Sequence, residues 1–205
     1  KRRATPTGAA RWARPGRAID GTRALWQSIG SAPRAAHESS QLMFRIRKSI
    51  DVDFAHHVRG HLGPCINLHG HTWKLEVVVG ADELDSQGFV IDFGLLKREV
   101  LAPCHALLDH ALAIGERTFS EIERELSETG RKLLESRGPA RCEESAPQQL
   151  SLHGARSAYP GGMKLAVFPF SPTSERIAQW LFELAASRLD DQRVKVVLGR
   201  VYETL

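Results

Sequence analysis

The residues best suited to chemistry lie in the segment Cys65–Trp73, which contains one thiol and two imidazoles. If the chain is extended from His69 onward, side chains two positions apart share one face of the strand. His69 and His71 then point the same way, and Trp73 continues their face into an apolar run. Two imidazoles on one face provide part of a zinc site, because a catalytic zinc takes three protein ligands and keeps one position open.

The third ligand is expected from the preceding segment, Phe44–His56. Its even positions are mostly apolar and its odd positions mostly polar, which predicts a half-buried strand with His56 on the apolar face. His57 and His61 are competing ligands, but His57 has the opposite phase and His61 lies in a glycine-flanked turn. A single histidine is more often an ordinary, partly buried residue. The zinc hypothesis therefore depends on the combination of His56, the pair at 69 and 71, and Cys65.

Composition sets limits on the class of protein. A chain of 205 residues can form one domain with a sizeable core. It has no run of 18 apolar residues, so we expect no membrane partner. Three irregularly spaced cysteines do not form a disulfide framework, which favours a reducing, cytoplasmic location and leaves Cys65 free for chemistry.

The net charge of +4 is concentrated in residues 1–41, which hold eight Lys or Arg and two acids. The remainder carries about −2, so we expect no nucleic-acid partner for the folded part. Residues 1–41 are predicted to be a disordered basic tail. An organelle transit peptide is an alternative, and a third is that Met43 is the natural start and the tail a non-native extension. The folded domain is expected to span residues 42–205.

The order of the expected elements indicates an α+β fold, with an antiparallel sheet and helices packed on one face. Strands are expected over 44–56, 69–79, 89–93, 164–170 and 193–204. Helices are expected over 95–101, ended by Pro103, over 118–134, and after the segment Pro172–Glu175. The Gly-, Pro- and Ser-rich range 136–162 is expected to be a flexible insertion.

Asp109 and His110 directly follow an apolar run, which suggests that the chain leaves the core there. A polar pair at a helix end is the alternative explanation. One more carboxylate, Glu203, lies at the end of the last strand.

In this order, the motifs resemble the family of 6-pyruvoyl-tetrahydropterin and 6-carboxytetrahydropterin synthases over about residues 44–110 and 165–204. The matching motifs are Phe54-Ala55-His56, Gly60-His61, Cys65-x-x-x-His69-Gly70-His71, Gly88–Phe93 with Leu96-Lys97, Leu108-Asp109-His110, Pro172-Thr173-Ser174-Glu175 and Val201–Thr204.

The resemblance implies a tunnelling fold, in which sheets from several subunits close a barrel, usually in a homo-hexamer. It implies zinc on His56, His69 and His71, with Cys65 as the proton acceptor. The roles it implies for the remaining site residues are an acid/base pair of Asp109 and His110, pterin binding and completion of the proton relay by Glu203, and a pterin pocket lined by Thr173, Ser174 and Glu175. Because Asp109 cannot orient its own neighbour within a regular strand, this pairing predicts a bend at Asp109.

The family substrate is 7,8-dihydroneopterin triphosphate. The three-residue gap between Cys65 and His69 is similar to the 6-carboxytetrahydropterin branch, which releases acetaldehyde and triphosphate and serves queuosine or deazapurine synthesis. Elimination of triphosphate to the 6-pyruvoyl product is the nearest alternative. A non-catalytic zinc- or pterin-binding protein is the alternative of another class, and a zinc hydrolase is disfavoured because no H-E-x-x-H helix is present.

The residue types suit this chemistry. A zinc with an open position lowers the pKa of bound hydroxyls, and a thiol beside a dication is pushed toward thiolate. A carboxylate such as Glu203 matches the adjacent N–H donors of a 2-aminopyrimidinone edge. The triphosphate needs cations, and Lys48, Arg59 and Lys97 are all candidates. Orienting partners for the second nitrogens of the histidines are required, but the sequence selects none.

Overall fold

The structure, a computed structural model, describes residues 43–135 and 148–204. Its strands are β1 (Phe44–His56), β2 (His69–Ala81), β3 (Leu112–Gly115), β4 (Ser151–Leu152), β5 (Ala155–Ala158), β6 (Leu165–Phe168) and β7 (Val194–Tyr202). Its α-helices are α1 (Phe93–Leu96), α2 (Ala102–Leu108), α3 (Glu116–Glu135) and α4 (Ser174–Leu189), with shorter helical turns at Pro64–Ile66, Lys97–Leu101 and Pro160–Gly162.

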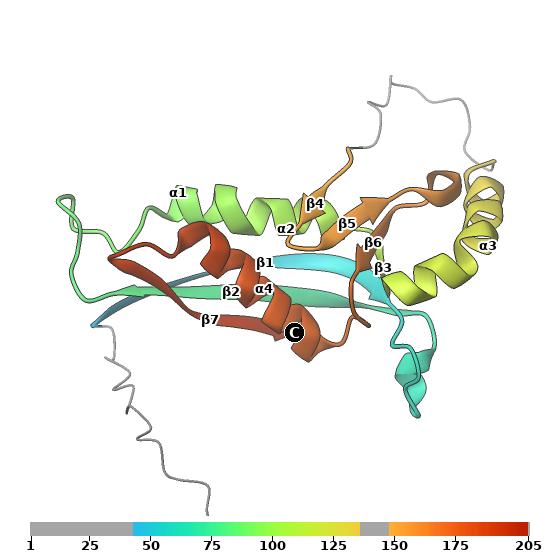
Figure 1. Cartoon of the computed structure of the whole chain (residues 1–205), viewed down its shortest axis with the longest axis horizontal. Helices are drawn as coiled ribbons and strands as arrows, with labels where there is room; N and C mark the ends of the chain where they lie inside the picture. The colour runs from blue at the N-terminus through green and yellow to red at the C-terminus, as the bar shows by residue number, and fades with distance from the viewer. Residues whose placement is uncertain (1–42, 136–147, 205) are drawn as a thin grey trace, which may run out of the picture. The chain divides into compact units, whose positions relative to one another are not determined.

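The strands form one sheet in the order β4-β5-β6-β3-β1-β2-β7. The long β1–β2 pair is antiparallel, and β7 continues this pattern on the far side of β2. Within the part of the chain that the structure describes, only the pairs β1–β3 and β3–β6 are parallel. The expected α+β class with a mostly antiparallel sheet is confirmed (Figure 1).

The apolar phase of the first two strands is buried as predicted. Val52 and Phe54 of β1 and the run Trp73, Leu75, Val77 and Val79 of β2 are almost fully buried. They form one core cluster with residues of α2, of α4 and of the turn Lys97–Leu101, so these helices cover a single face of the sheet. The strand phase therefore decides which side chains of β1 and β2 enter the core.

Helix α3 packs outside the main core cluster, in a second cluster of its own. Phe119 and Leu126 of α3 pack with Ile114, Leu165 and Val167 in a second cluster. Because Ala113 and Ala166 belong to the main cluster, both faces of the β3–β6 pair are buried. The near-continuous apolar sequence of these short strands reflects this burial on two sides.

The region 89–108 differs from the sequence prediction. Residues 89–92 form no strand, because the Asp92 side chain accepts hydrogen bonds from Gly94 and Leu95 and caps the helix that follows. The helix also does not end at Pro103. A π-helical turn precedes α2. Pro103 has no N–H to donate to the Glu99 carbonyl, and this carbonyl accepts a hydrogen bond from Arg188 instead.

The expected flexible insertion over 136–162 is wrong for its second half. Residues Ser151–Ala158 form the β4–β5 hairpin, whose two-residue turn places both His153 and Gly154 at positive φ, 44° and 80°. Residues 136–147 lie outside the described part of the chain, as does the predicted tail, residues 1–41. In the described part, no helix is long and apolar enough to cross a membrane.

Candidate metal centre

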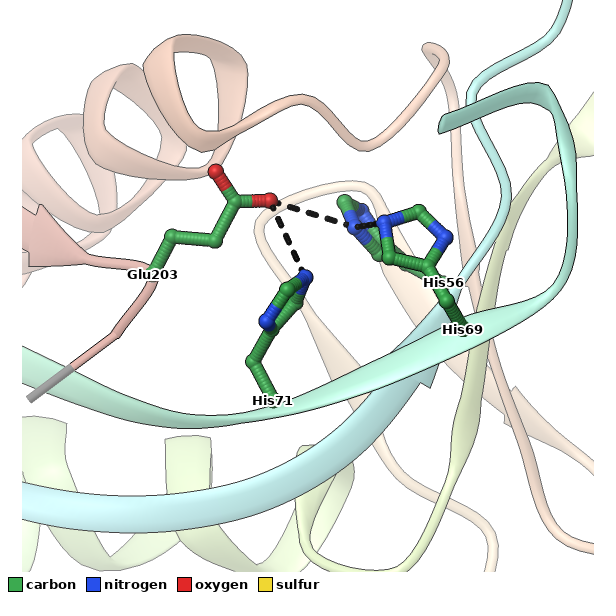
Figure 2. Close-up of side chains that lie close together, drawn as sticks. All are labelled: His56, His69, His71 and Glu203. Carbon is green, nitrogen blue, oxygen red and sulfur yellow. Dashed lines mark hydrogen bonds and ion pairs between the residues drawn. The ribbon is translucent and has the colours of Figure 1, made fainter. Parts of the chain in front are cut away.

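Three imidazoles converge where β1 ends and β2 begins. His56 and His69 are direct cross-strand neighbours, and His71 lies two positions further along β2. Nε2 of His56 is 3.0 Å from Nε2 of His69. Figure 2 shows these rings together with Glu203, and one ligand atom from each of the four residues lies within 4.8 Å of the others. The predicted grouping of the three histidines is therefore present in the structure.

Backbone carbonyls orient two of the rings. Nδ1 of His56 donates to the Pro172 carbonyl at 2.9 Å, and Nδ1 of His69 donates to the Asn67 carbonyl at 2.8 Å. A carbonyl only accepts, so each Nδ1 carries the proton and each Nε2 presents its lone pair. This arrangement is typical of metal-binding histidines, whose second N–H is held by an outer partner.

The geometry of the donors fits a metal ion. Two lone pairs facing each other at 3.0 Å repel unless a cation lies between them, so the contact between His56 and His69 is not a stable hydrogen bond. The carboxylate of Glu203 is 3.3 Å from Nε2 of His56 and 3.6 Å from Nε2 of His71. A tetrahedral zinc with bonds of about 2.1 Å separates neighbouring donors by about 3.4 Å.

His71 gives independent support for a ligand. Its buried Nε2 has no hydrogen-bond partner among the described residues. Buried polar atoms are nearly always satisfied, and an exception requires a reason such as an ion. The nitrogen points toward the other donors (Figure 2), so the ion that satisfies it would also separate the lone pairs of His56 and His69.

The surroundings keep His56 neutral. The residue is only 1% exposed. Burial is the largest cause that lowers the pKa of His56 below its usual 6.5; the bond to Pro172 opposes the shift, and the neighbouring histidines add to it. A neutral imidazole is the form that binds a metal.

Cys65 lies in the loop between β1 and β2, on the helical turn Pro64–Ile66. It is partly buried and forms no disulfide. Its sulfur is not one of the atoms that converge on the candidate metal centre. The loop itself is fixed: Val58 N–H donates to the Cys65 carbonyl at 3.0 Å, and His57 Nδ1 donates to Ile66 at 2.7 Å.

The competing ligands are therefore occupied elsewhere. His57 holds the loop through Ile66, and Nδ1 of His61 accepts from the Gly63 amide at 3.0 Å. Neither histidine belongs to the group around the candidate metal centre.

Asp109 and His110 form a hydrogen-bonded turn at the end of α2. Nδ1 of His110 donates to the Asp109 carboxylate at 2.9 Å, and the His110 amide, at φ 56°, donates to the Asp53 carbonyl at 2.7 Å. Lys164 donates to the Asp109 carbonyl at 2.6 Å. Burial alone raises the pKa of Asp109, but the bond from His110 and the charge of nearby His105 outweigh it and lower the pKa. The expected bend is confirmed.

His110 borders a cavity on the sheet face opposite the metal centre, because Asp53, Ala55, Gly70 and Thr72 also line it and alternate in direction with the histidine ligands. His110 and His71 both line this cavity of about 500 Å³ at the end of the β1–β2 pair. The His110 side chain is 81% exposed, so its ring is accessible from solvent. Among the described residues, the donor atoms that converge come from His56, His69, His71 and Glu203, and the structure does not bring Asp109 and His110 of this chain into that group.

The segment Thr173–Glu175 directly follows the carbonyl of Pro172 that orients His56. Thr173 is the N-cap of α4, and its hydroxyl accepts from the Arg176 amide at 3.3 Å. Glu175 lies in the first turn of α4. A structural duty as a helix cap therefore accompanies any pocket role of Thr173.

Two of the three cations considered for the triphosphate are already engaged. Arg59 pairs with Glu121 through both of its terminal nitrogens. Lys48 lies 5.2 Å from the centre of the Phe93 ring. Lys97 is exposed on the π-helical turn.

Sequence reasoning missed the supporting residues. Pro172 and Asn67 act through backbone carbonyls, for which the sequence carries no signal. Lys164 and His105 support Asp109 from positions that become neighbours only in the fold. The position of Glu203 beside the imidazoles was also not foreseen, although its carboxylate was singled out.

Taken together, the sheet, its helices and the histidine cluster define a tunnelling-fold protein with a candidate metal centre. An uncharacterized protein from Wolinella succinogenes has a similar structure, with a TM-score of 0.54 and 26% identity over 78% of this chain and 93% of that one.

The chain belongs to the 6-pyruvoyl tetrahydropterin synthase family, whose model matches residues 45–205. It is 31% identical to the 6-carboxy-5,6,7,8-tetrahydropterin synthase of Haemophilus influenzae, over 79% of this chain and 94% of the relative. It is 36% identical to the Bacillus subtilis protein of the same name, over 45% of this chain and 59% of the relative.

Proposed function

We propose that this protein is a zinc-dependent 6-carboxytetrahydropterin synthase. The reaction converts 7,8-dihydroneopterin triphosphate and water to 6-carboxy-5,6,7,8-tetrahydropterin, acetaldehyde and triphosphate. The observation that carries the proposal is the convergence of three Nε2 atoms, two of them oriented by Nδ1 bonds to carbonyls. Relatives named 6-carboxy-5,6,7,8-tetrahydropterin synthase support the choice of branch.

The chain's own residues divide the work. His56, His69 and His71 would hold the zinc, which supplies a Lewis acid that acidifies the side-chain hydroxyls of the substrate. Cys65 would take a proton from a side-chain carbon, and His110, held by Asp109 at 2.9 Å, would return or relay protons. Thr173, Ser174, Glu175 and Glu203 would surround the pterin.

We also propose the assembly and context that go with this family resemblance. The protein would act as a cytoplasmic homo-oligomer, a hexamer in the expected form, in which sheets close a barrel. Its pathway would be queuosine or deazapurine synthesis. Two sheet edges in the described residues, along β7 and along most of β1, are available for pairing with other copies.

Incubation with 7,8-dihydroneopterin triphosphate, with and without a chelator, tests the activity. We expect a product that has lost a two-carbon aldehyde, and no product after the metal is removed. Mass spectrometry separates the alternatives, because triphosphate elimination to the 6-pyruvoyl product retains all three side-chain carbons. No turnover of the metal-loaded protein would favour a non-catalytic binding protein.

Cys65→Ala tests the proton acceptor. We expect turnover to fall by at least about 100-fold, since a positioned base typically contributes that much. Zinc content should stay unchanged, because the sulfur lies outside the group of converging donors. Cys104→Ala is the matched control: burial raises the pKa of this thiol to about 12, so it stays protonated and inert. Full activity of Cys65→Ala would contradict the assignment.

A further inference from the structure

The candidate metal centre has one donor more than a catalytic zinc requires. Such a site uses three protein ligands and leaves the fourth position to water or substrate. Here the Glu203 carboxylate joins the three imidazoles, and its Oε1 is 3.3 Å from His56 and 3.6 Å from His71 (Figure 2). Four protein donors are typical of a closed, structural site. A reactive centre must open one position for the substrate.

The four donors are not held equally. His56 and His69 lie on paired strands, and a carbonyl fixes the second nitrogen of each ring. Glu203 follows the last residue of β7, one position beyond Tyr202, which forms the final pair with β2. Its side chain is 36% exposed, while that of His56 is 1% exposed.

No described residue other than these histidines contacts the Glu203 carboxylate by a hydrogen bond or ion pair. Within the described residues, rotation of its side chain would therefore break only the two contacts with the histidines. The rings of His56 and His69, in contrast, can leave the centre only if their carbonyl contacts are lost, and the His71 ring packs edge-on against Trp73. The centre thus combines two imidazoles held by carbonyls and a third packed against Trp73 with one carboxylate that can move.

We propose that Glu203 is the fourth metal ligand of the resting enzyme and that the vicinal hydroxyls of the substrate displace it. The inference depends on the proposed zinc site. In the resting state, the carboxylate lowers the net charge of the centre from +2 to +1 and blocks its open position. A carboxylate that accepts from both adjacent N–H donors of the pterin edge engages both of its oxygens, so this mode of pterin binding by Glu203 would itself open the metal.

Cobalt substitution with azide as a probe tests the resting ligand. Co²⁺ in a tetrahedral site absorbs visible light, and its bands shift when a small anion enters an open position. We expect azide to bind the Glu203→Gln protein at least about tenfold more tightly than the unchanged protein, which corresponds to about 1.4 kcal/mol. Glu128→Gln, which removes the same charge from the exposed surface of α3, is the matched control and should behave like the unchanged protein.

A second measurement addresses zinc directly. The Glu203→Gln protein should bind zinc more weakly, because one ligand is lost. We expect the affinity for zinc to fall by about 10-fold, the size of effect that loss of a ligand's orienting partner produces. Glu203→Asp, which keeps the charge on a shorter stem, should give an intermediate azide affinity. If Glu203 serves only the pterin, azide and zinc affinities will be equal in all these proteins, and the inference is overturned.

Displacement is tested with 7,8-dihydroneopterin, which has the hydroxyls but no phosphates. We expect it to shift the cobalt bands of the unchanged protein; unaltered bands at saturation would overturn the displacement step. Failure of the inference is distinguishable from failure of the proposed function. If no variant or unchanged protein binds cobalt, the metal centre and the proposed function both fail, whereas a cobalt protein equally open to azide in all forms refutes only the role of Glu203.

Discussion

The buried position of His56 links the metal centre to the stability of the protein. Its ring is a ligand only when neutral, and burial together with the neighbouring imidazoles keeps it so by lowering its pKa. The same burial makes the metal-free protein sensitive to acid, because protonation of His56 is easier in the unfolded chain.

The sign of this effect follows from proton linkage. The unfolded chain takes up a proton at the ordinary pKa of 6.5 and the folded chain only at lower pH, so stability falls as pH drops below 6.5. The contribution reaches at most about 1.4 kcal/mol for each pH unit between the two pKa values. Carboxylates with lowered pKa values, such as Asp109, act in a more acidic range and do not interfere.

We predict that the free energy of unfolding of the metal-free protein decreases between pH 7 and pH 5.5, and that His56→Gln reduces this decrease. Urea unfolding at both pH values measures it. The comparison concerns the difference between the two pH values, since the substitution also changes packing. An identical pH dependence in the two proteins would show that His56 does not titrate as the structure indicates.

At the scale of single residues, the sequence predicts the candidate metal ligands but not the groups that orient them. The phases of β1 and β2 place His56, His69 and His71 correctly because the side-chain direction alternates in a strand. The Pro172 carbonyl could not be predicted, because it lies 116 residues from His56 in the chain and any residue type offers a carbonyl. The positive φ of His110 was foreseen only as a bend.

Among the elements, the contact between α4 and β7 is unusually close at Gly199. A Cβ atom at this position would lie 2.9 Å from the Phe182 amide nitrogen and 3.0 Å from the Ala178 carbonyl oxygen. Both atoms belong to the backbone of α4, so no side-chain rearrangement relieves the clash. The glycine thereby sets how close α4 lies to the strand that leads into Glu203.

We therefore predict that Gly199→Ala lowers the free energy of unfolding by about 1–3 kcal/mol, the usual cost of overpacking. Chemical denaturation measures the loss. Gly88→Ala provides a useful contrast, because a Cβ there meets no atom within 4 Å and only its φ of 84° is unfavourable. Unchanged stability of Gly199→Ala would mean that α4 can shift away from β7 without cost.

Elements that follow from hydrophobic period or capping were predictable, and those decided by distant contacts were not. Helices α3 and α4 lie close to their predicted ranges. The strand expected over 89–93 failed because the capping side chain of Asp92 competes with an apolar run. The stop expected at Pro103 failed because Arg188, from a helix much later in the chain, satisfies the Glu99 carbonyl.

In the whole molecule, the sheet is open at both sides of its long strands. β3 pairs with β1 only at Ala55 and His56, so the edge of β1 over residues 44–54 has no partner strand among the described residues. β7 is the last strand of the sheet order. Long unpaired edges are templates for strand addition, which agrees with the proposed barrel of several copies.

We predict that the protein in solution has a mass that is a multiple of 22.7 kDa, six-fold for the expected hexamer. Size-exclusion chromatography with light scattering measures it. A monomer at micromolar concentration would contradict the assembly but not the metal centre, whose four candidate donors all belong to one chain. The sequence could not reveal assembly by pattern alone, because an edge strand and a central strand show the same alternation.

The cross-strand pairing of His56 with His69 has a further consequence for how the chain folds. A metal ion held by both rings would clasp the two ends of the intervening connection, much as a disulfide closes a loop, and would reduce the freedom of the unfolded chain. Since β1 and β2 are consecutive, this clasp can form before distant parts of the sequence arrive. Metal uptake would then speed up folding as well as equip the enzyme, and it would hold the thiol-bearing connection in its working shape from the beginning.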